Sequence, residues 1–381
     1  MASARAGRYV SQPGGFRAFI PAPLPPVPPL AFDDELTRFL SEADQALGRL
    51  DGAASILPNP ELFVAMYVRR EAVYSSQIEG TQSTLEDVLE FEAGGGKPSR
   101  PKDVKEVVNY VRAMDYGLRR LTELPVCLRL IREIHAELLK GVRGADRTPG
   151  EFRRSQNWIG PEGTPLAAAI YVPPPVHEMQ AALGDLEKFL HQRGTMPLLV
   201  HCGLAHAQLE TIHPFLDGNG RVGRLLITFL LCWQGALQRP LLYLSHYFKA
   251  HRAEYYDRLM AIRNDGNWEG WLKFFLSGVR DVSVQATETA RQIIDLREQH
   301  RRLLAGSAYD LKLVDHLFQT PIVSVPAAQK ILGCSSPTAY TVIGRLVKQG
   351  LLQETTGRRR DRWYRYKPYL DLFEGQNAPT T

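Results

Sequence analysis

The sequence predicts an all-α fold that carries a small β-hairpin and ends in a module of helices with minor β structure. Apolar side chains three and four residues apart recur from about residue 33 to about residue 317, which is the period of helices buried on one face. The segment 157–175 breaks this rhythm with glycines, prolines and a short extended stretch, which indicates a hairpin or flap. From about residue 308, helix, helix, longer helix and hairpin follow one another.

The individual elements follow from these patterns in chain order. Residues 21–29 are rich in proline, lack backbone donors, and predict an extended packed arm or a loosely ordered segment. Asp33 and Asp34 stand where the first helix begins, a position that the helix dipole favours for acids. Gly80 is placed to end the second helix. Helices are expected at 33–50, 59–80, 105–121, 128–139, 178–193, 198–211, 220–234 and 271–304.

The chain divides into three expected regions: an N-terminal helical region at 1–95, a central helical domain at 96–300, and the C-terminal module at 301–381. With 44% hydrophobic and 23% charged residues among 381, the composition is that of an ordinary globular protein. The longest apolar run, 225–233, is too short to span a membrane. Four scattered cysteines without a CxxC pair, and an N-terminus without an apolar segment, predict reduced thiols, no signal peptide and a cytoplasmic location.

The most informative stretch is IHPFLDGNGRVGRL, residues 212–225. Gly218, Gly220 and Gly223 have the GxGxxG spacing of a dinucleotide-binding loop. That motif needs a buried strand before it and an acidic residue about 20 residues after it. The residues before Gly218 instead have helical spacing, and no acid lies at the required distance. The stretch therefore does not indicate a dinucleotide-binding fold.

A zinc site is a second interpretation, because His201, His206 and His213 lie close together in the sequence with Cys202 beside them. His201 and His206 are five residues apart, which on a helix separates their side chains by about 140°. They face apart rather than converge. Histidines that belong to the packing of the helix explain this pattern better than a metal centre.

The third interpretation uses the whole stretch. A glycine-rich loop lies between two expected helices, and free N–H groups before a helix N-terminus favour anions. Asp217 could hold a Mg²⁺ that bridges phosphate oxygens. Arg221 and Arg224 lie on one helical face and suit phosphate oxygens, while His213 could accept a proton from an attacking hydroxyl. These residues predict phosphoryl or nucleotidyl transfer; an ordinary helix cap with solvated arginines is the alternative.

The run HPFLDGNGR, followed by Arg224, resembles the signature of the Fic family, HxFx(D/E)GNGRxxR, with every position matched. The resemblance implies a Fic helical core and transfer of AMP from ATP to a protein hydroxyl. It implies that His213 is the general base, that Phe215 packs beneath the loop, and that Asp217 is the Mg²⁺ ligand. The related Doc branch, which phosphorylates, carries lysine where this chain has Gly220, so glycine favours AMP transfer. The ATP-binding residues implied by the signature are Gly218, Asn219, Gly220, Arg221 and Arg224, the last on the γ-phosphate.

An inhibitory motif is suggested by SSQIEG, residues 75–80, which resembles the Fic pattern (S/T)xxxE(G/N) at Ser75, Glu79 and Gly80. The resemblance implies that Glu79 pairs with Arg224 and blocks the γ-phosphate site. The physical reason is that a carboxylate on the guanidinium removes the phosphate ligand and repels the phosphate. By itself the spacing is common, and a surface helix end is the alternative.

The expected flap, TPLAAAIYVPPP, resembles the Fic hairpin that aligns the target segment beside the site. An extended edge can pair its backbone with an extended target, and Ala168, Ile170 and Tyr171 would lie there. Family members also place aromatic and amide side chains from the helix after the signature against adenine. The candidates here are Tyr255 or Tyr256, together with Asn264.

The C-terminal stretch 335–366 resembles a bacterial winged helix-turn-helix domain. Ser335 or Ser336 could cap its recognition helix, and a basic wing suits phosphate contacts. The fold alone leaves DNA contact, protein or self-association and a purely structural role all open. Expected outward-facing residues on the helix are Thr338, Tyr340, Thr341 and Arg345, and those on the wing are Arg358, Arg359, Arg360, Arg362, Trp363 and Arg365.

Together these features predict an ATP-dependent protein adenylyltransferase that uses Mg²⁺, acts on a Ser, Thr or Tyr hydroxyl of a target protein or of itself, and is inhibited by Glu79. Three alternatives stay open: a DNA-binding regulator whose Fic-like domain senses nucleotide, an enzyme that removes AMP with Glu79 orienting water, and a different diphosphate donor. The assembly state, monomer or homodimer, also stays open.

Overall fold

The computed structural model describes residues 5–55, 60–94, 101–161, 163–356 and 362–374. Over these residues the fold is mostly helical with two small antiparallel sheets, as the sequence predicts. The helices are α1 (Asp34–Ser55), α2 (Pro60–Ile78), α3 (Leu85–Glu92), α4 (Pro101–Arg120), α5 (Leu128–Leu138), α6 (Val176–His191), α7 (Leu198–Ile212), α8 (Asn219–Trp233), α9 (Ser245–Ala250), α10 (Arg252–Asp265), α11 (Trp268–Leu303), α12 (Ala308–Leu317), α13 (Val325–Leu332), α14 (Ser336–Lys348) and α15 (Lys367–Glu374). The strands are β1 (Gly7–Ser11), β2 (Arg17–Pro21), β3 (Ile322–Ser324), β4 (Leu352–Glu354) and β5 (Trp363–Tyr366).

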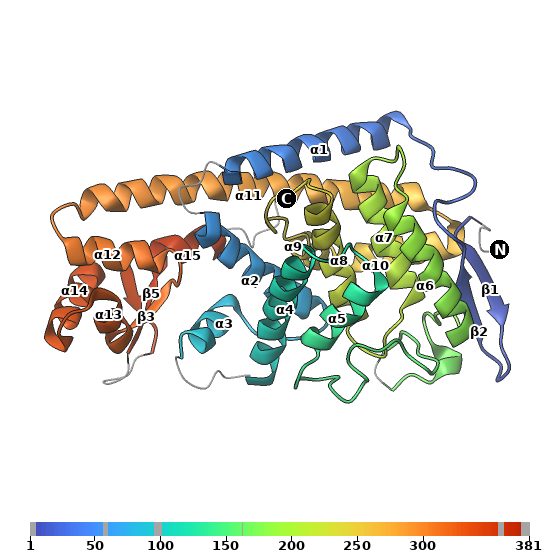
Figure 1. Ribbon diagram of the computed structural model, residues 1–381, viewed down its shortest axis with the longest axis horizontal. Coiled ribbons are helices and arrows are strands. Elements are labelled where there is room, and N and C mark those ends of the chain that lie inside the picture. Colours follow the sequence, from blue (N-terminus) through green and yellow to red (C-terminus); the bar gives the residue numbers. More distant parts are fainter. Residues whose placement is uncertain (1–4, 56–59, 95–100, 162, 357–361, 375–381) are drawn as a thin grey trace.

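The core forms around the antiparallel pair α7 and α8, which lie in the middle of the helical domain (Figure 1). From Leu199 to Ile212 every residue of α7 is buried, so this helix is covered on all sides. Such a helix shows no amphipathic stripe, because each face packs on another element. Gly117 of α4 lies so close to the ring of Phe229 on α8 that a Cβ there would be 2.3 Å from it. The α4–α8 contact therefore depends on glycine.

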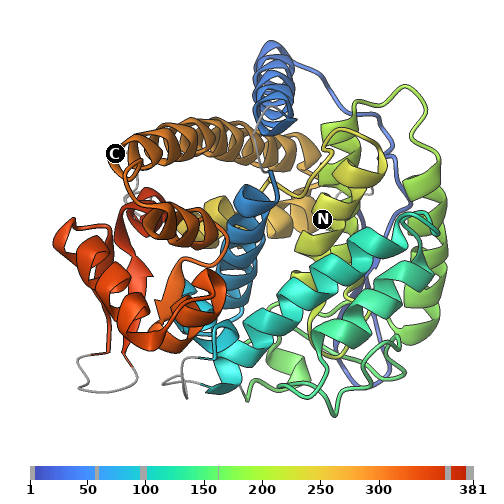
Figure 2. The same ribbon diagram turned by 60° about the vertical axis from the view of Figure 1, so that its left-hand side comes forward.

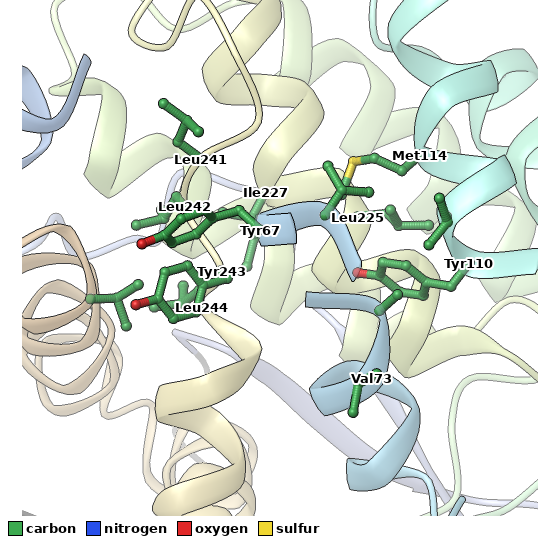
Figure 3. Packing of buried hydrophobic residues seen from close by; sticks show 14 of the residues in the cluster. Tyr67, Val73, Tyr110, Met114, Leu225, Ile227, Leu241, Leu242, Tyr243 and Leu244 are labelled. Atoms are coloured by element: carbon green, nitrogen blue, oxygen red, sulfur yellow. The ribbon is translucent and has the colours of Figure 1, made fainter. Parts of the chain in front are cut away.

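Helix α2 packs into this core between Tyr243 on one side and Tyr110 on the other (Figure 3). Its Tyr67 packs against Tyr243, with ring centroids 4.8 Å apart. Tyr110 of α4 lies on the other side of α2 and donates to buried Glu71 at 3.1 Å. An aromatic pair of this kind contributes about 0.5–1.5 kcal/mol in addition to the free energy gained by burying its surface. These contacts fix the helix that leads to residue 79.

The longest helix, α11, runs along the molecule from the helical domain to the C-terminal module, and α1 lies beside it (Figures 1 and 2). The buried positions of α1 repeat at helical spacing and include Leu36, Ala43, Leu47 and Leu50. Lys273 of α11 adds polar contacts at one end of the pair, because its Nζ donates to Asp33 at 2.7 Å and to Glu35 at 2.6 Å. The domain boundary expected at residue 300 falls inside α11, and the one expected at residue 95 lies outside the described residues.

The N-terminal segment contains a hairpin that the sequence patterns do not reveal. Residues 7–21 form an antiparallel pair of strands in which Gly7 faces Pro21. The alternation of buried and exposed side chains explains it, because Phe19 and Ala18 are buried while Arg17 is exposed. The hairpin lies against the flap, where the Phe19 N–H donates to the Val172 carbonyl at 2.9 Å. The proline-rich part after it, residues 22–30, forms neither helix nor strand and has bends at residues 24–25 and 27–28.

The C-terminal module has the predicted order of three helices and a hairpin, and it adds β3 and α15, which the sequence patterns do not reveal. Its sheet has the strand order β3-β5-β4, all antiparallel. Ser335 caps α14, as expected, by accepting from the Thr338 N–H at 3.4 Å. In Figure 1 this module lies at the opposite end of the molecule from the N-terminal hairpin. Among the described residues, no helix combines the length and apolar character that a membrane crossing requires.

Several residues expected on the wing surface face the rest of the chain instead. Trp363 is buried, and Arg365 contacts Glu86 of α3. The expected strand is present, but the burial of Trp363 and the contact of Arg365 with α3 turn these two side chains toward the chain. Arg345, expected to face outward on the helix, is exposed and also paired with Asp310 of α12, with its Nη2 2.6 Å from Oδ1. Of the remaining expected residues, Tyr340 and Arg362 are exposed, whereas Arg358, Arg359 and Arg360 lie outside the described residues.

Candidate active site

The α7–α8 loop, residues 213–218, reverses the chain between the two central helices. Helix α7 ends at His213, whose backbone is left-handed at φ 49° and ψ 60°. For a residue with a Cβ this conformation costs about 1–2 kcal/mol, and such positions gather at functional sites. Gly218, at φ 80°, begins α8 in the same region, where glycine avoids the cost. The loop therefore carries strain at its histidine and none at its glycine.

Asn219 closes the loop with its side chain. Its Oδ1 accepts from the Phe215 N–H at 2.9 Å, and its Nδ2 donates to the Phe215 carbonyl at 2.8 Å. Phe215 itself is buried, as predicted, and stacks on the His135 ring with centroids 3.7 Å apart. Asn219 was expected to contact phosphate as part of the anion loop. Its side chain instead fixes the turn, and only its backbone can contribute to that cradle.

Three side chains that sequence reasoning missed hold the loop from outside. Arg153 Nε donates to the His213 carbonyl at 3.1 Å, and Asn157 Nδ2 donates to the carbonyls of His213 at 3.2 Å and Phe215 at 2.8 Å. His135 Nδ1 accepts from the Gly150 N–H, so its Nε2 carries the proton and donates to the Asp217 carbonyl at 3.0 Å. Burial lowers the pKa of His135 to about 4, which keeps this ring neutral.

The N-terminus of α8 has the features that the expected anion site requires. The first backbone N–H groups of a helix have no carbonyl acceptor within it, and Gly218 supplies no side-chain cap. Asp217 turns its Oδ1 toward the Gly218 N–H at 2.6 Å, and its side chain is about one-third exposed. Its Oδ2 faces Gly144, where a Cβ would be only 2.7 Å away. Backbone donors and the helix dipole together favour phosphate at this position.

The two arginines of the signature have different partners in the structure. Arg221 is fully buried and directs Nη1 to Glu106 of α4 at 3.4 Å and Nη2 to Asp217 at 3.5 Å. Its Nε is buried without a hydrogen-bond partner among the described residues. Arg224, one turn later, points toward the end of α2 instead. Glu106, which nothing in the signature indicates, thus holds Arg221 in an ion pair. Arg224 instead contacts the inhibitory motif.

The pair implied by the inhibitory motif is present. Arg224 Nη2 lies 2.7 Å from Glu79 Oε1, while Ser75 accepts from Arg224 at its hydroxyl and its carbonyl at 2.8 and 2.9 Å. Burial alone would raise the pKa of Glu79, but Arg224 beside it outweighs burial and lowers the pKa. A Cβ at Gly220 would be 2.2 Å from Glu79 Oε1, so the pair also needs glycine at that position. From the sequence alone, Gly220 is explained only by the orientation of bound ATP that a glycine there favours.

His213 presents a neutral imidazole. Burial, together with the positive charges of Arg263 and Arg153, lowers the pKa of His213 to about 3. Its Nδ1 is buried without a hydrogen-bond partner among the described residues. At neutral pH the ring is therefore unprotonated and can accept a proton. This is the protonation state that a general base requires.

A second buried carboxyl lies behind the pair and was not expected. Glu210 of α7 has an unpartnered Oε1 among the described residues, and Gly223 approaches so closely that a Cβ there would be 2.4 Å from that oxygen. Burial raises the pKa of Glu210 to about 7. Beside it, His206 bonds to the Gly223 carbonyl at 2.8 Å and to the Tyr255 hydroxyl at 2.9 Å. His206 and Tyr255 are therefore packing residues, and Tyr255 is no adenine candidate.

The remaining adenine candidates fall in different places. Tyr256 is 38% exposed and lies beside Tyr255, with ring centroids 5.2 Å apart. Burial, with Glu79 next in size, raises its pKa to about 12, which places its ring near the inhibitory pair. Asn264 is exposed and accepts from the Tyr9 hydroxyl of the N-terminal hairpin at 3.3 Å. The structure thus brings Tyr256 to the site and ties Asn264 to the hairpin.

The flap, residues 157–175, contains one β-bridge between Ile159 and Tyr171 and a 3₁₀ turn at Leu166–Ala168. Ile170 is 62% exposed and Ala168 is exposed, so both are accessible to a target segment. Tyr171 is a correction, because its side chain is buried and donates to the Thr211 carbonyl at 2.6 Å. The alternation of an extended strand, which places neighbours on opposite faces, explains the difference.

The expected Mg²⁺ would have one carboxylate ligand here, that of Asp217. Among the described residues, no cluster of three or more His, Cys, Asp or Glu side chains is arranged to hold a metal ion. His201, considered for zinc, bonds to the Phe189 carbonyl at 2.9 Å. Mg²⁺ needs fewer protein ligands, because it is commonly held by one or two carboxylates plus substrate phosphates. The partly exposed carboxylate of Asp217 beside the anion site fits an ion that arrives with a nucleotide.

Comparisons with known proteins agree with the arrangement of this site. Residues 37–119 match the model of the Fic/DOC family N-terminal region, and residues 125–231 match the model of the Fic/DOC family. The protein adenylyltransferase Fic of Drosophila grimshawi is 31% identical over 208 residues, which cover 53% of this chain and 39% of that protein. The protein of the same name from Drosophila willistoni is 30% identical over 262 residues, which cover 62% of this chain and 49% of that protein. The chain thus spans less than half the length of either relative.

A solved structure has the same fold. A Fic family protein from Desulfovibrio desulfuricans superposes with a TM-score of 0.58 and covers 89% of this chain and 98% of its own. At 20% sequence identity this likeness concerns the fold alone. It extends the similarity beyond the two matched segments, because its coverage is wider than theirs.

Proposed function

Since the chain belongs to the Fic/DOC family, we propose that it transfers AMP from ATP to a Ser, Thr or Tyr hydroxyl of a protein, and that Glu79 restrains this reaction. The observation that carries the proposal is the convergence of neutral His213, the N-terminus of α8 and the Glu79–Arg224 pair. A base, an anion site and a phosphate-binding arginine are the parts that nucleotidyl transfer needs. The named relatives support the reaction class.

The transfer follows from these positions. The phosphates of ATP bind at the N-terminus of α8, where backbone N–H groups and the helix dipole favour negative charge. The hydroxyl oxygen of the target attacks the α-phosphorus, His213 accepts the hydroxyl proton, and the bond to the β-phosphate breaks to release diphosphate. Mg²⁺ held by Asp217 would neutralise phosphate charge when it is bound. Arg221 adds a fixed positive charge next to Asp217.

Glu79 would inhibit the transfer in two ways: it occupies the Arg224 guanidinium, and its charge repels phosphate there. Arg224 gives Nη2 to Glu79 and Ser75 and Nε to Ser75, so the donors that would bind a terminal phosphate are occupied. A phosphate there would also meet the negative charge of Glu79, whose pKa lies below its ordinary value. ATP must therefore displace Glu79 to place its phosphates for attack. Replacing Glu79 by glycine removes the competitor and leaves Arg224 bound to Ser75.

The test incubates the full chain and its Glu79→Gly variant with ATP labelled at the α-phosphate, Mg²⁺ and a cell lysate. We expect label on protein, increased at least about 10-fold by Glu79→Gly, because a competing ion pair of about 1.4 kcal/mol or more accounts for that factor. His213→Ala is the negative control. Unlabelled protein with every variant would contradict the proposal. Loss of label from previously modified protein on adding the wild type would instead indicate removal of AMP.

Self-modification and the identity of the target hydroxyl are decided in the same experiment. Mass spectrometry of the labelled protein identifies the modified residue as Ser, Thr or Tyr and shows whether it belongs to this chain. A parallel reaction with ATP labelled only at the γ-phosphate distinguishes AMP transfer from phosphorylation. Label retained from the γ-phosphate would show that Gly220 does not select the orientation of the donor.

A further inference from the structure

Arg153 is buried without a role in the proposed chemistry. It is 1% exposed, and among the described residues no carboxylate lies within ion-pair distance of it. Its side chain instead donates to three carbonyls: Nε to His213, Nη1 to Ser155 and Nη2 to Pro174, the first two at 3.1 Å and the last at 2.5 Å. Its backbone N–H donates to the Pro214 carbonyl at 2.9 Å.

A buried guanidinium that meets only neutral acceptors is unfavourable for the fold, because the lost hydration is not compensated by an opposite charge. An apolar side chain would fill the same space at lower cost. What an apolar side chain cannot do is bind three carbonyls at fixed angles, which the planar fork of arginine does. The three carbonyls belong to the α7–α8 loop, to the segment beside Arg153 and to the end of the flap.

The carbonyls around the strained turn are bound by side chains from outside it. The carbonyl of Thr211 accepts from the Tyr171 hydroxyl, and that of His213 accepts from both Arg153 and Asn157. A helix C-terminus leaves its last carbonyls without partners, so these bonds replace the missing helical ones. They also fix the direction of the His213 backbone at φ 49°, a conformation that it would otherwise leave.

We infer that Arg153 is a positioning residue for the transfer: by binding the His213 carbonyl and the Pro214 carbonyl, it keeps His213 left-handed and its imidazole at the α8 N-terminus. This inference rests on the proposed function for its kinetic consequence only. Asn157 assists from the same side of the loop. Because Arg153 also binds Pro174, it connects the base of the flap to the residue that accepts the proton.

The kinetic test compares Arg153→Lys with Arg154→Lys, both in the Glu79→Gly background. Lysine keeps the charge, but its N–H donors all lie on one nitrogen and do not reproduce the planar fork that binds three separate carbonyls. Arg154, in contrast, is exposed and pairs with Glu151. We expect Arg153→Lys to lower kcat about 10- to 100-fold, because a small displacement of a reacting group has an effect of this size. The KM for ATP should change less than about 3-fold, since Asn219 and His135 still hold the anion site. Equal kcat for the two variants would overturn the inference.

A second measurement does not depend on activity. In protein labelled with ¹³C-histidine, the Cα and Cβ shifts of His213, assigned by comparison with His213→Gln, report its backbone conformation. We expect these shifts to move in Arg153→Lys, to move less in Asn157→Ala and to stay in Arg154→Lys. Unchanged shifts in a folded Arg153→Lys protein would overturn the inference. If Glu79→Gly transfers no AMP while the shifts move as expected, the proposed function fails and the positioning role stands.

Discussion

The α7–α8 loop and the flap are neighbouring segments without regular secondary structure, and they are built in opposite ways. The loop is held at residue after residue by hydrogen bonds to side chains, including those of Asn219, Asn157 and His135. In its described residues the flap has one β-bridge and a short turn, and it leaves Ile170 and Trp158 exposed. Phosphate chemistry requires fixed donors, whereas recognition of an extended segment requires an accessible edge. The contrast agrees with the proposed roles, in which the loop carries the reaction and the flap receives the target.

The largest expected effect comes from opening the loop. Asn219→Ala leaves the buried Phe215 N–H without its acceptor, which costs about 1–3 kcal/mol of stability. The anion site loses its shape, so AMP transfer in the Glu79→Gly background should fall at least about 100-fold. Initial rates and thermal unfolding measure the two effects. Gln292→Ala, on an exposed amide side chain of α11, is the control, and an Asn219→Ala rate within 3-fold of the parent would refute a closing role for Asn219.

A smaller effect is expected where the flap is anchored. Tyr171→Phe removes the hydroxyl that donates to the Thr211 carbonyl and leaves the ring in place under Arg263. The free energy of unfolding should fall by about 1–2 kcal/mol, because a buried hydrogen bond is lost. Chemical denaturation of the variant and of Tyr340→Phe, an exposed tyrosine, measures this difference. Equal stability of the two variants would mean that Tyr171 does not anchor the flap.

The exposed part of the flap should affect target binding alone. Ile170→Ala removes a side chain that is 62% exposed, so stability should not change. We expect the KM for the protein target to rise about 3-fold, in keeping with about 0.7 kcal/mol of lost apolar contact. Steady-state kinetics with the identified target give this value, with Val284→Ala on α11 as the exposed control. An effect on ATP affinity instead would place Ile170 outside the docking edge.

The smallest expected change is in the protonation of His213. Because burial lowers its pKa to about 3, the ring stays neutral as pH falls from 8 to 5, whereas an ordinary histidine with a pKa of about 6.5 becomes protonated. The imidazole C–H resonances of His213 should therefore shift little over this range. Protonation of His213 with a midpoint near 6.5 would show that the loop does not exclude water from the ring.

Much of this site could be predicted from the order of residues. The signature fixed the identity of His213, Asp217 and Arg224, and the inhibitory motif implied the partner of Arg224 from 145 residues away. Helical periodicity placed α4 to α8 within a few residues of their ends, because these helices are long and one-sided or follow clear proline signals. The N-terminal hairpin was missed because its prolines and glycines dominate the local pattern.

What the sequence by itself determined is the set of residues at the α8 N-terminus on which the proposed chemistry depends, since these residue types stand at fixed spacing within one turn and one helix. Only the tertiary structure decided which side chains reach the loop from elsewhere. Arg153, His135 and Glu106 carry no motif of their own, and they act because α4, α5 and the segment before the flap pack around residues 213–221. Burial and distance gave them their roles, and neither is encoded in local spacing. The same packing turned Tyr171 inward and left Ile170 exposed.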